Sequence, residues 1–411
     1  MALYEADGGG QSSPDFRTWG GAAASAAAPP RLPFLDGLRA FAALWVLLGH
    51  CHLFVLGWER SGSLWGRPLD LLLYSHLGVS LFLVLSGFCL ALPVVRQGNR
   101  LTGTAQYLKA RAWRILPPYY AALLLLLLLN SFWPIAQWGR HPVGLTPTLP
   151  LPVMATNLLL LQDLFPDYNL LNGPFWSIAT EWHLYFAFPA LVWVLRRFGT
   201  GALLLCGAAA AVALTWLGFS FAYVVGTMKV PQPPYFIALF VMGAAAASFA
   251  FDPRYAPLRP RLQRMGWLAG AVLCVPLCAL LWQYRIVGGH NVWDFLNHLH
   301  LIDPLSGAVA AAWLVGLCGL RPAHWLRRLL ESRVMVAIGG YSYSLYLTHV
   351  PILAVLNHWM ENAGIVKASP LSAFFLLAVG GGLSCLLFAW GFSSVFERRY
   401  RQSKGSSAIL S

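Results

Sequence analysis

Charged side chains are scarce in this chain, and their scarcity excludes most soluble folds. Of the 411 residues, 10% are Asp, Glu, Lys or Arg and 58% are hydrophobic. In a soluble domain about a quarter of the residues are charged. The composition therefore predicts an integral membrane protein with many apolar segments, in contact with membrane lipid.

Cysteine is sparse too, and its placement excludes a disulfide framework. All seven cysteines lie within or at the edge of apolar segments, where Cys usually acts as a small hydrophobic residue. The sequence has no metal-type Cys/His spacing, so we expect no metal. Because a basic segment followed by a strong apolar run is missing from the start, we expect no cleaved signal peptide. Residues 1–32, rich in Gly, Ala, Ser and Pro, are predicted to be a disordered cytoplasmic tail.

Long apolar runs, by contrast, are abundant. Spanning segments in lipid satisfy their backbone groups internally, so we expect an all-α polytopic helical membrane protein. The stretch 149–162 is about half as long as a span and contains Pro150 and Pro152, which predicts a short re-entrant or interfacial segment. A transmembrane domain is thus expected over 33–400, followed by a cytoplasmic tail at 401–411. About ten transmembrane helices are predicted, at 37–56, 70–95, 115–133, 176–195, 201–225, 235–251, 266–284, 303–320, 334–357 and 371–396.

The basic residues give the expected orientation. With ten spans, 22 of the 28 Lys and Arg residues fall on the side that holds both termini. The positive-inside rule then predicts that both termini are cytoplasmic, and a bacterial inner (plasma) membrane is the expected location. The excess of positive charge is explained by topology and headgroup contact, so we expect no nucleic-acid partner.

Arg39 and His50 stand at the two ends of an otherwise apolar run in the first predicted span. Eleven residues at ~1.5 Å each put His50 roughly 16 Å further along the helix, near the membrane midplane. An ionisable side chain there costs about 2 to 3 kcal/mol or more, which indicates a functional site. Arg39 could instead extend to the headgroups, and His50 could be a hydrogen-bonded packing residue.

Three further groups of polar residues border or enter the predicted spans. Arg111 and Arg114 are three residues apart, so on a helix they share a face and could bind a phosphate together; ordinary anchoring at the membrane surface is the alternative. Glu181 lies in the outer half of its span and needs a cation, a polar network or a substrate to stay charged. Tyr346 and His349 fall on one helical face. Aromatic residues near these groups could also belong to an interfacial belt.

At these residues the chain resembles the integral membrane acyltransferase 3 family. The matching elements occur in order between about 33 and 400: Phe34 to Arg39 with His50, Gly78 to Phe88, the Arg-x-x-Arg pair, Trp176-Ser177 to Tyr185, and Ser342 to His349. One departure is Leu81-Phe82, where many members carry two aromatic residues.

The resemblance implies an O-acyltransferase that moves an acyl group, most simply acetyl, from acyl-CoA on the cytoplasmic side to a hydroxyl of a cell-surface glycan. It implies catalytic roles for His50 and Arg39 and donor binding by Arg111 and Arg114. Chemistry adds that His50 could act as general base on the acceptor hydroxyl. Direct transfer and an acyl-histidine intermediate both fit these residues.

The remaining site residues are expected to support the reaction. Glu181 or His349 would orient or charge-stabilise His50 or bind the sugar, and Tyr346, Trp176 and Ser177 would line the acceptor side. We expect no soluble hydrolase-like domain after residue 411, so separate envelope-glycan enzymes are expected as possible partners.

Two other functions also fit part of the pattern. A proton-coupled secondary transporter of a small polar or anionic solute would use the intramembrane His and Glu, but leaves Arg111 and Arg114 without a role. A non-catalytic assembly subunit is the third hypothesis. Turnover of a CoA thioester separates the enzyme from both.

Overall fold

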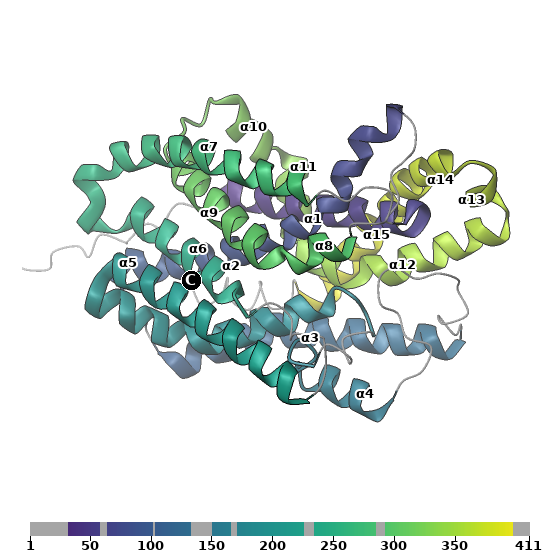
Figure 1. Cartoon of the computed structure of the whole chain (residues 1–411), viewed down its shortest axis with the longest axis horizontal. Coiled ribbons are helices and arrows are strands. Elements are labelled where there is room, and N and C mark those ends of the chain that lie inside the picture. The colour runs from purple at the N-terminus through teal and green to yellow at the C-terminus, as the bar shows by residue number, and fades with distance from the viewer. Residues whose placement is uncertain are drawn as a thin grey trace, which may run out of the picture. The chain divides into compact units, whose positions relative to one another are not determined.

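The architecture is that of a helical membrane protein. The computed structural model describes residues 32–57, 64–101, 103–132, 150–165, 171–225, 234–284 and 292–397. Within these ranges every regular element is a helix (Figure 1), which agrees with the predicted fold class. The helices are α1 Pro33–Leu56, η1 Leu64–Tyr74, α2 His76–Arg96, α3 Thr104–Phe132, α4 Leu151–Leu158, α5 Phe175–Val225, α6 Phe236–Phe251, η4 Pro253–Leu258, α7 Arg259–Gln283, α8 Val292–Asn297, α9 Leu299–Cys318, α10 Trp325–Leu330, α11 Arg333–Gly340, α12 Ser342–Asn362, α13 Ile365–Ala368, α14 Pro370–Leu376, η5 Leu377–Gly381 and α15 Gly382–Phe396.

Seven helices of the described chain are long and apolar enough to cross a membrane. One of them, α5, breaks at Gly199, whose φ of 87° is outside the helical range, so it contains both predicted spans 176–195 and 201–225. Helix α4 has eight residues, too few to cross, as expected for the stretch 149–162. The predicted tails lie mostly or wholly outside the described residues.

Some predicted boundaries are displaced. Helix α3 begins at Thr104, well before the predicted start of its span at 115, so Arg111 and Arg114 lie on the helix and share a face as predicted. The predicted span 334–357 is two helices, α11 and α12, separated at Tyr341. Helix α9 begins at Leu299, four residues before the predicted span, and this places Asp303 inside the helix.

Glycine allows three pairs of helices to approach at backbone distance. A Cβ added to Gly87 of α2 would lie 1.9 Å from the carbonyl oxygen of Phe240, and one added to Gly243 of α6 would lie 1.9 Å from that of Val84. Small residues at such contacts are typical of membrane helix pairs. In the same way, Gly37 of α1 packs against the carbonyl of Leu330 in α10, and Gly339 of α11 packs against that of Asp36 in α1. These contacts fix α1 and α2, the two helices that carry the first sequence elements.

A substitution tests the α2–α6 contact. Gly87→Ala forces a methyl group against a backbone carbonyl that has little room to move, so we expect a loss of stability of about 1 to 3 kcal/mol. Thermal unfolding in detergent measures it. Gly391→Ala in α15 is the matched control, because nothing lies within 4 Å of its added Cβ. Equal unfolding temperatures for the two variants would contradict the tight contact.

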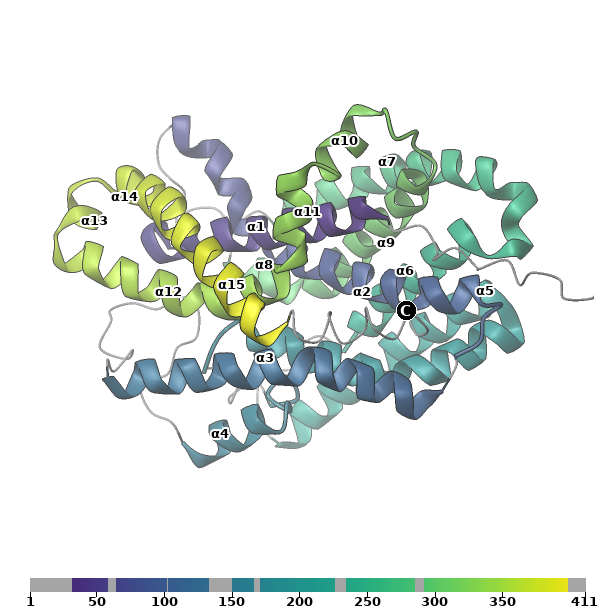
Figure 2. The same ribbon diagram turned by 180° about the vertical axis from the view of Figure 1, so that it is seen from behind.

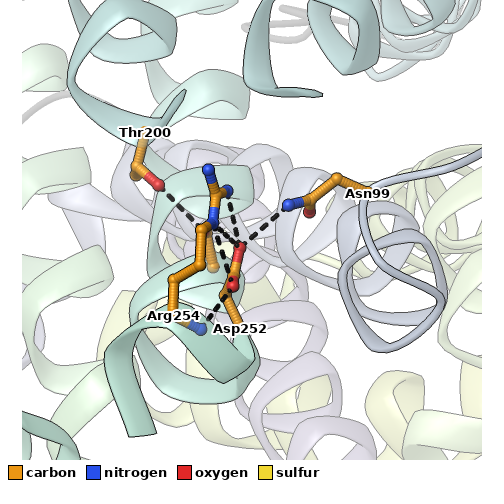
Figure 3. Close-up of polar contacts among 5 residues, drawn as sticks. Asn99, Thr200, Asp252 and Arg254 are labelled. Carbon is orange, nitrogen blue, oxygen red and sulfur yellow. Dashed lines mark hydrogen bonds and ion pairs between the residues drawn. The ribbon is translucent and has the colours of Figure 1, made fainter. Parts of the chain in front are cut away.

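The ends of α2 and α6 meet the break in α5 at a polar cluster formed by Asn99, Thr200, Ser248, Asp252 and Arg254 (Figure 3). Asp252 is buried and accepts hydrogen bonds from the Asn99 amide (2.9 Å) and the Arg254 guanidinium (2.7 Å). Burial opposes ionisation of this carboxyl, but the hydrogen bonds from Arg254 and Asn99 outweigh it and lower the pKa of Asp252. The cluster therefore joins three helices at the end opposite to His76.

Helices far apart in the sequence lie side by side around α1. Helix α12 packs against both α1 and α15 (Figure 2). Helix α4 lies beside α3 in both views, where Tyr119 and Tyr120 donate hydrogen bonds to the carbonyls of Asn157 and Leu158. This packing brings α1, α2, α5 and α12 together around the residues singled out in the sequence.

Candidate active site

The site contains a pair of histidines from opposite parts of the sequence. His50 Nδ1 of α1 lies 2.9 Å from His349 Nε2 of α12, and the ring centroids are 4.9 Å apart. His349 is 1% exposed, and its Nδ1 lies 3.0 Å from the Leu345 carbonyl oxygen. The contact joins residues 299 positions apart, and it is the strongest geometric feature of the site.

The contacts determine which ring nitrogens carry hydrogen when both histidines are neutral. A carbonyl oxygen only accepts, so His349 Nδ1 must donate to Leu345, and His349 Nε2 then has a lone pair. That lone pair accepts the hydrogen of His50 Nδ1. His50 Nε2 is left without hydrogen and with its lone pair available, which is the tautomer that a general base or a nucleophile requires.

Helix α5 is joined to this pair at its first turns. Ser177 Oγ lies 2.8 Å from the Tyr346 hydroxyl, and the Tyr346 ring centroid is 5.9 Å from that of His349. The Asn172 amide donates to the Leu347 carbonyl at 3.3 Å. Ser177 and Tyr346 are therefore brought beside the histidine pair.

A second polar group surrounds Glu181. Its Oε1 accepts hydrogen bonds from Ser86 Oγ of α2 and from the Tyr185 hydroxyl, both at 2.6 Å. Arg39 interacts electrostatically with Glu181 and forms an ion pair with Asp36 at 3.0 Å. Of the two residues expected to orient His50, His349 is the one that contacts it; the hydrogen bonds of Glu181 go to Ser86 and Tyr185.

The arginine pair lies next to the same group. Both Arg111 and Arg114 interact electrostatically with Tyr185. The Arg111 guanidinium also lies over the Tyr107 ring, 5.9 Å from its centroid, and Arg114 is exposed. The positive charge of α3 therefore reaches the polar group around Glu181.

One face of α5 connects the two groups. Ser177, Glu181 and Tyr185 are spaced four residues apart, so they form a stripe on one side of the helix. The stripe is about 12 Å long at 1.5 Å per residue. Its Tyr185 end lies beside the arginine pair, and its Ser177 end lies beside Tyr346 and the histidine pair.

Sequence reasoning missed a third polar group beside Trp176. Asp303 of α9 is fully buried and contacts His76, whose ring centroid lies 6.0 Å from that of Trp176. The sequence does contain a signal for this group, an acidic residue within an apolar run. Asp303 was not recognised because the predicted span began at Asp303 itself. A further pair, His183 and Asp163, lies at 3.0 Å and was also missed.

Among the described residues, no three or more His, Cys, Asp or Glu side chains are grouped so that they could hold a metal ion.

Comparison with known proteins identifies the family. A family model described as an acyltransferase domain matches residues 32–393, nearly the whole chain. The chain belongs to the acyltransferase 3 family. It is therefore an acyltransferase, and the family resemblance seen in the sequence is confirmed.

Curated relatives agree with this assignment. Acyltransferase MdmB of Streptomyces mycarofaciens is 24% identical over 345 residues, covering 79% of this chain and 80% of the relative. Peptidoglycan O-acetyltransferase OatA of Listeria monocytogenes is 24% identical over 353 residues, covering 80% of this chain and 50% of the relative. O-acetyltransferase OatA of Staphylococcus aureus is 22% identical over 354 residues, covering 82% and 53%. The chain thus spans about half the length of the two OatA proteins. No solved structure matches the chain.

Proposed function

We propose that this acyltransferase transfers an acetyl group from acetyl-CoA to a hydroxyl of a carbohydrate-type acceptor. The observation that carries the proposal is the His50–His349 contact, because it presents a lone pair on His50 Nε2 inside a membrane segment. Two relatives are named O-acetyltransferases, one of them of peptidoglycan, which supports a glycan hydroxyl as the acceptor. The family assignment also favours an enzyme over a transporter or an assembly subunit.

In this mechanism the donor enters from the end of the site that carries the arginines. The phosphates of acetyl-CoA bind Arg111 and Arg114, with Arg39 further inside. The long pantetheine arm follows the α5 stripe, so that the thioester reaches His50. By the positive-inside rule this end faces the cytoplasm of a bacterial cell, with both termini on the same side of the inner membrane.

The transfer step uses His50 as general base. Its Nε2 takes the proton of the acceptor hydroxyl as the oxygen attacks the thioester carbon. A new C–O ester bond forms, the C–S bond breaks, and the proton passes from His50 to the sulfur of the leaving CoA. His349 keeps His50 in the required tautomer throughout and stabilises its positive charge when the proton is taken.

Removing the arginine charges tests the donor site. Arg111→Gln and Arg114→Gln are each expected to raise the KM for acetyl-CoA by roughly 10- to 100-fold, since hydrogen bonds to charged groups contribute about 1.5 to 3 kcal/mol. The KM is measured from thiol release by protein in detergent. Lys109→Gln is the control, because it removes a positive charge from an exposed position on the same helix. If all three variants kept the wild-type KM, the arginines would be surface anchors only.

A further inference from the structure

Asp303 organises a polar group that the proposed transfer step does not use. Its side chain is fully buried in α9 and accepts three hydrogen bonds: from Ser80 Oγ at 2.8 Å, from His76 Nε2 at 3.0 Å and from the Tyr235 hydroxyl at 3.0 Å. The donors come from α2 and from the residue that precedes α6. A carboxylate in a membrane segment is costly and is usually retained for function.

The group fixes one tautomer of His76. The carboxylate accepts, so His76 Nε2 carries hydrogen and its Nδ1 has the lone pair when the ring is neutral. His76 is also more exposed than Asp303: its side chain is 20% exposed, whereas that of Asp303 is 0% exposed. An ionisable side chain within a membrane segment faces a water-accessible space rather than lipid. The three hydrogen bonds of Asp303 leave the Nδ1 lone pair of His76 unused, so Nδ1 is the atom through which this partly exposed ring can accept a hydrogen bond.

Two aromatic rings lie beside the imidazole. Trp176 is nearly parallel to His76, with an interplanar angle of 16°, and Phe236 is inclined by 29°, with a centroid distance of 6.2 Å. Trp176 and Phe236 are themselves 5.5 Å apart. Phe236 is fully buried, so the partly buried Trp176 is the ring of this pair that a ligand can contact. An aromatic ring beside a few positioned polar groups is typical of small-molecule sites. This combination suits a sugar ring, which has an apolar face of C–H groups and a rim of hydroxyls.

Two sets of contacts place the Asp303–His76 group next to the His50–His349 pair. A Cβ added to Gly49 would lie 2.0 Å from Ser75 Oγ, so the residues that precede His50 and His76 are in contact. On the other side, Trp176 adjoins Ser177, which contacts Tyr346 beside His349. A ligand bound at His76 is therefore close to the reacting centre.

We propose that His76, held by Asp303 and flanked by Trp176, is an acceptor-binding residue whose Nδ1 accepts a hydrogen bond from a ring hydroxyl of the carbohydrate. The inference rests on the proposed function and adds the position of the acceptor. It assigns the donor to the arginine end of the α5 stripe and the acceptor to the end where α2, α5, α6 and α9 begin.

The test separates the KM values of the two substrates. With acetyl-CoA and a soluble peptidoglycan disaccharide as probes, His76→Ala is expected to raise the KM for the disaccharide by roughly 10- to 100-fold, the size expected when a site loses a hydrogen bond to its substrate. The KM for acetyl-CoA should stay at the wild-type value. His76→Asn keeps an acceptor oxygen near the position of Nδ1 and should recover part of the affinity. Asp303→Asn, which keeps the side-chain shape but loses the charge, should fall between wild type and His76→Ala.

His183→Ala is the matched control. His183 is a part-exposed histidine whose Nδ1 contacts Asp163 at 3.0 Å, the same type of pair at a different place on α5. This variant should keep the wild-type KM for both substrates. Two results would overturn the inference. One is an equal rise in the KM for the disaccharide in His183→Ala and His76→Ala. The other is a His76→Ala variant whose KM for acetyl-CoA rises as much as its KM for the disaccharide.

Direct binding distinguishes a failure of this inference from a failure of the proposed function. Titration of the disaccharide into the purified protein without acetyl-CoA, followed by calorimetry, measures the acceptor site alone. Weaker binding to folded Asp303→Asn and His76→Ala than to wild type supports the site even when acetyl-CoA is not turned over. Equal binding to all three proteins overturns the site and leaves the proposed reaction standing.

Discussion

His50→Ala is expected to lower kcat by roughly 10²- to 10⁴-fold, the usual contribution of a general base. The variant removes the lone pair that takes the acceptor proton, an interaction that acts in the transition state. The values of kcat and kcat/KM should therefore fall together while the KM for acetyl-CoA changes little. Thiol release from acetyl-CoA in the presence of a glycan acceptor gives both constants.

The control for this experiment is His358→Ala, which removes a histidine from the outer turns of α12 without touching the pair. It should keep wild-type turnover, and both variants should elute as single species in detergent. A folded His50→Ala protein with the wild-type rate would refute the general-base assignment. Loss of turnover in His358→Ala as well would show that the effect is not specific to His50.

Replacing His349 by leucine is expected to have the second largest effect. Leucine cannot accept the hydrogen of His50 Nδ1, so the His50 ring loses the contact that selects its tautomer and orientation. We expect kcat to fall on the order of 10- to 10³-fold, which is less than the ~10⁴-fold loss caused by the wrong tautomer in a serine protease triad. The KM values for donor and acceptor should stay near those of wild type.

His349→Gln separates this positioning role from simple packing. The glutamine carbonyl can reach the position of His349 Nε2 and accept the same hydrogen, so this variant should recover much of the lost kcat. Leucine fills the buried space at least as well as glutamine does. If His349→Leu were as active as His349→Gln, packing rather than tautomer control would be the role of His349.

The sequence predicted the two histidines of the pair but not the contact between them. Position within a span identified His50 and His349 separately, because a titratable residue at that depth is costly whatever its neighbours are. Spacing along a helix does not determine which helices pack together, so the contact between them could not be derived. For the same reason, the depth of Glu181 in its span could be estimated from the sequence, but its hydrogen-bond partners on α2 and α5 could not be predicted.

The roles of Asp303 and His76 were missed in the sequence because the predicted helix boundaries near them were wrong. Asp303 was taken as the first residue of a span, where a carboxylate can reach water, and the structure extends α9 by four residues beyond it. His76 was likewise assigned to the interior of a longer predicted helix, whereas α2 begins at that residue. Helix ends are set by tertiary contacts, here by hydrogen bonds to a buried carboxylate on another helix.

The glycine contacts between α2 and α6 have a mechanical consequence. A protein that moves a solute across the bilayer by rocking needs helix interfaces that slide or rotate. At Gly87 and Gly243 each helix meets the backbone of the other, so a small rotation drives side chains into carbonyl groups. Helices α2 and α6 are therefore expected to stay fixed relative to each other while the enzyme works.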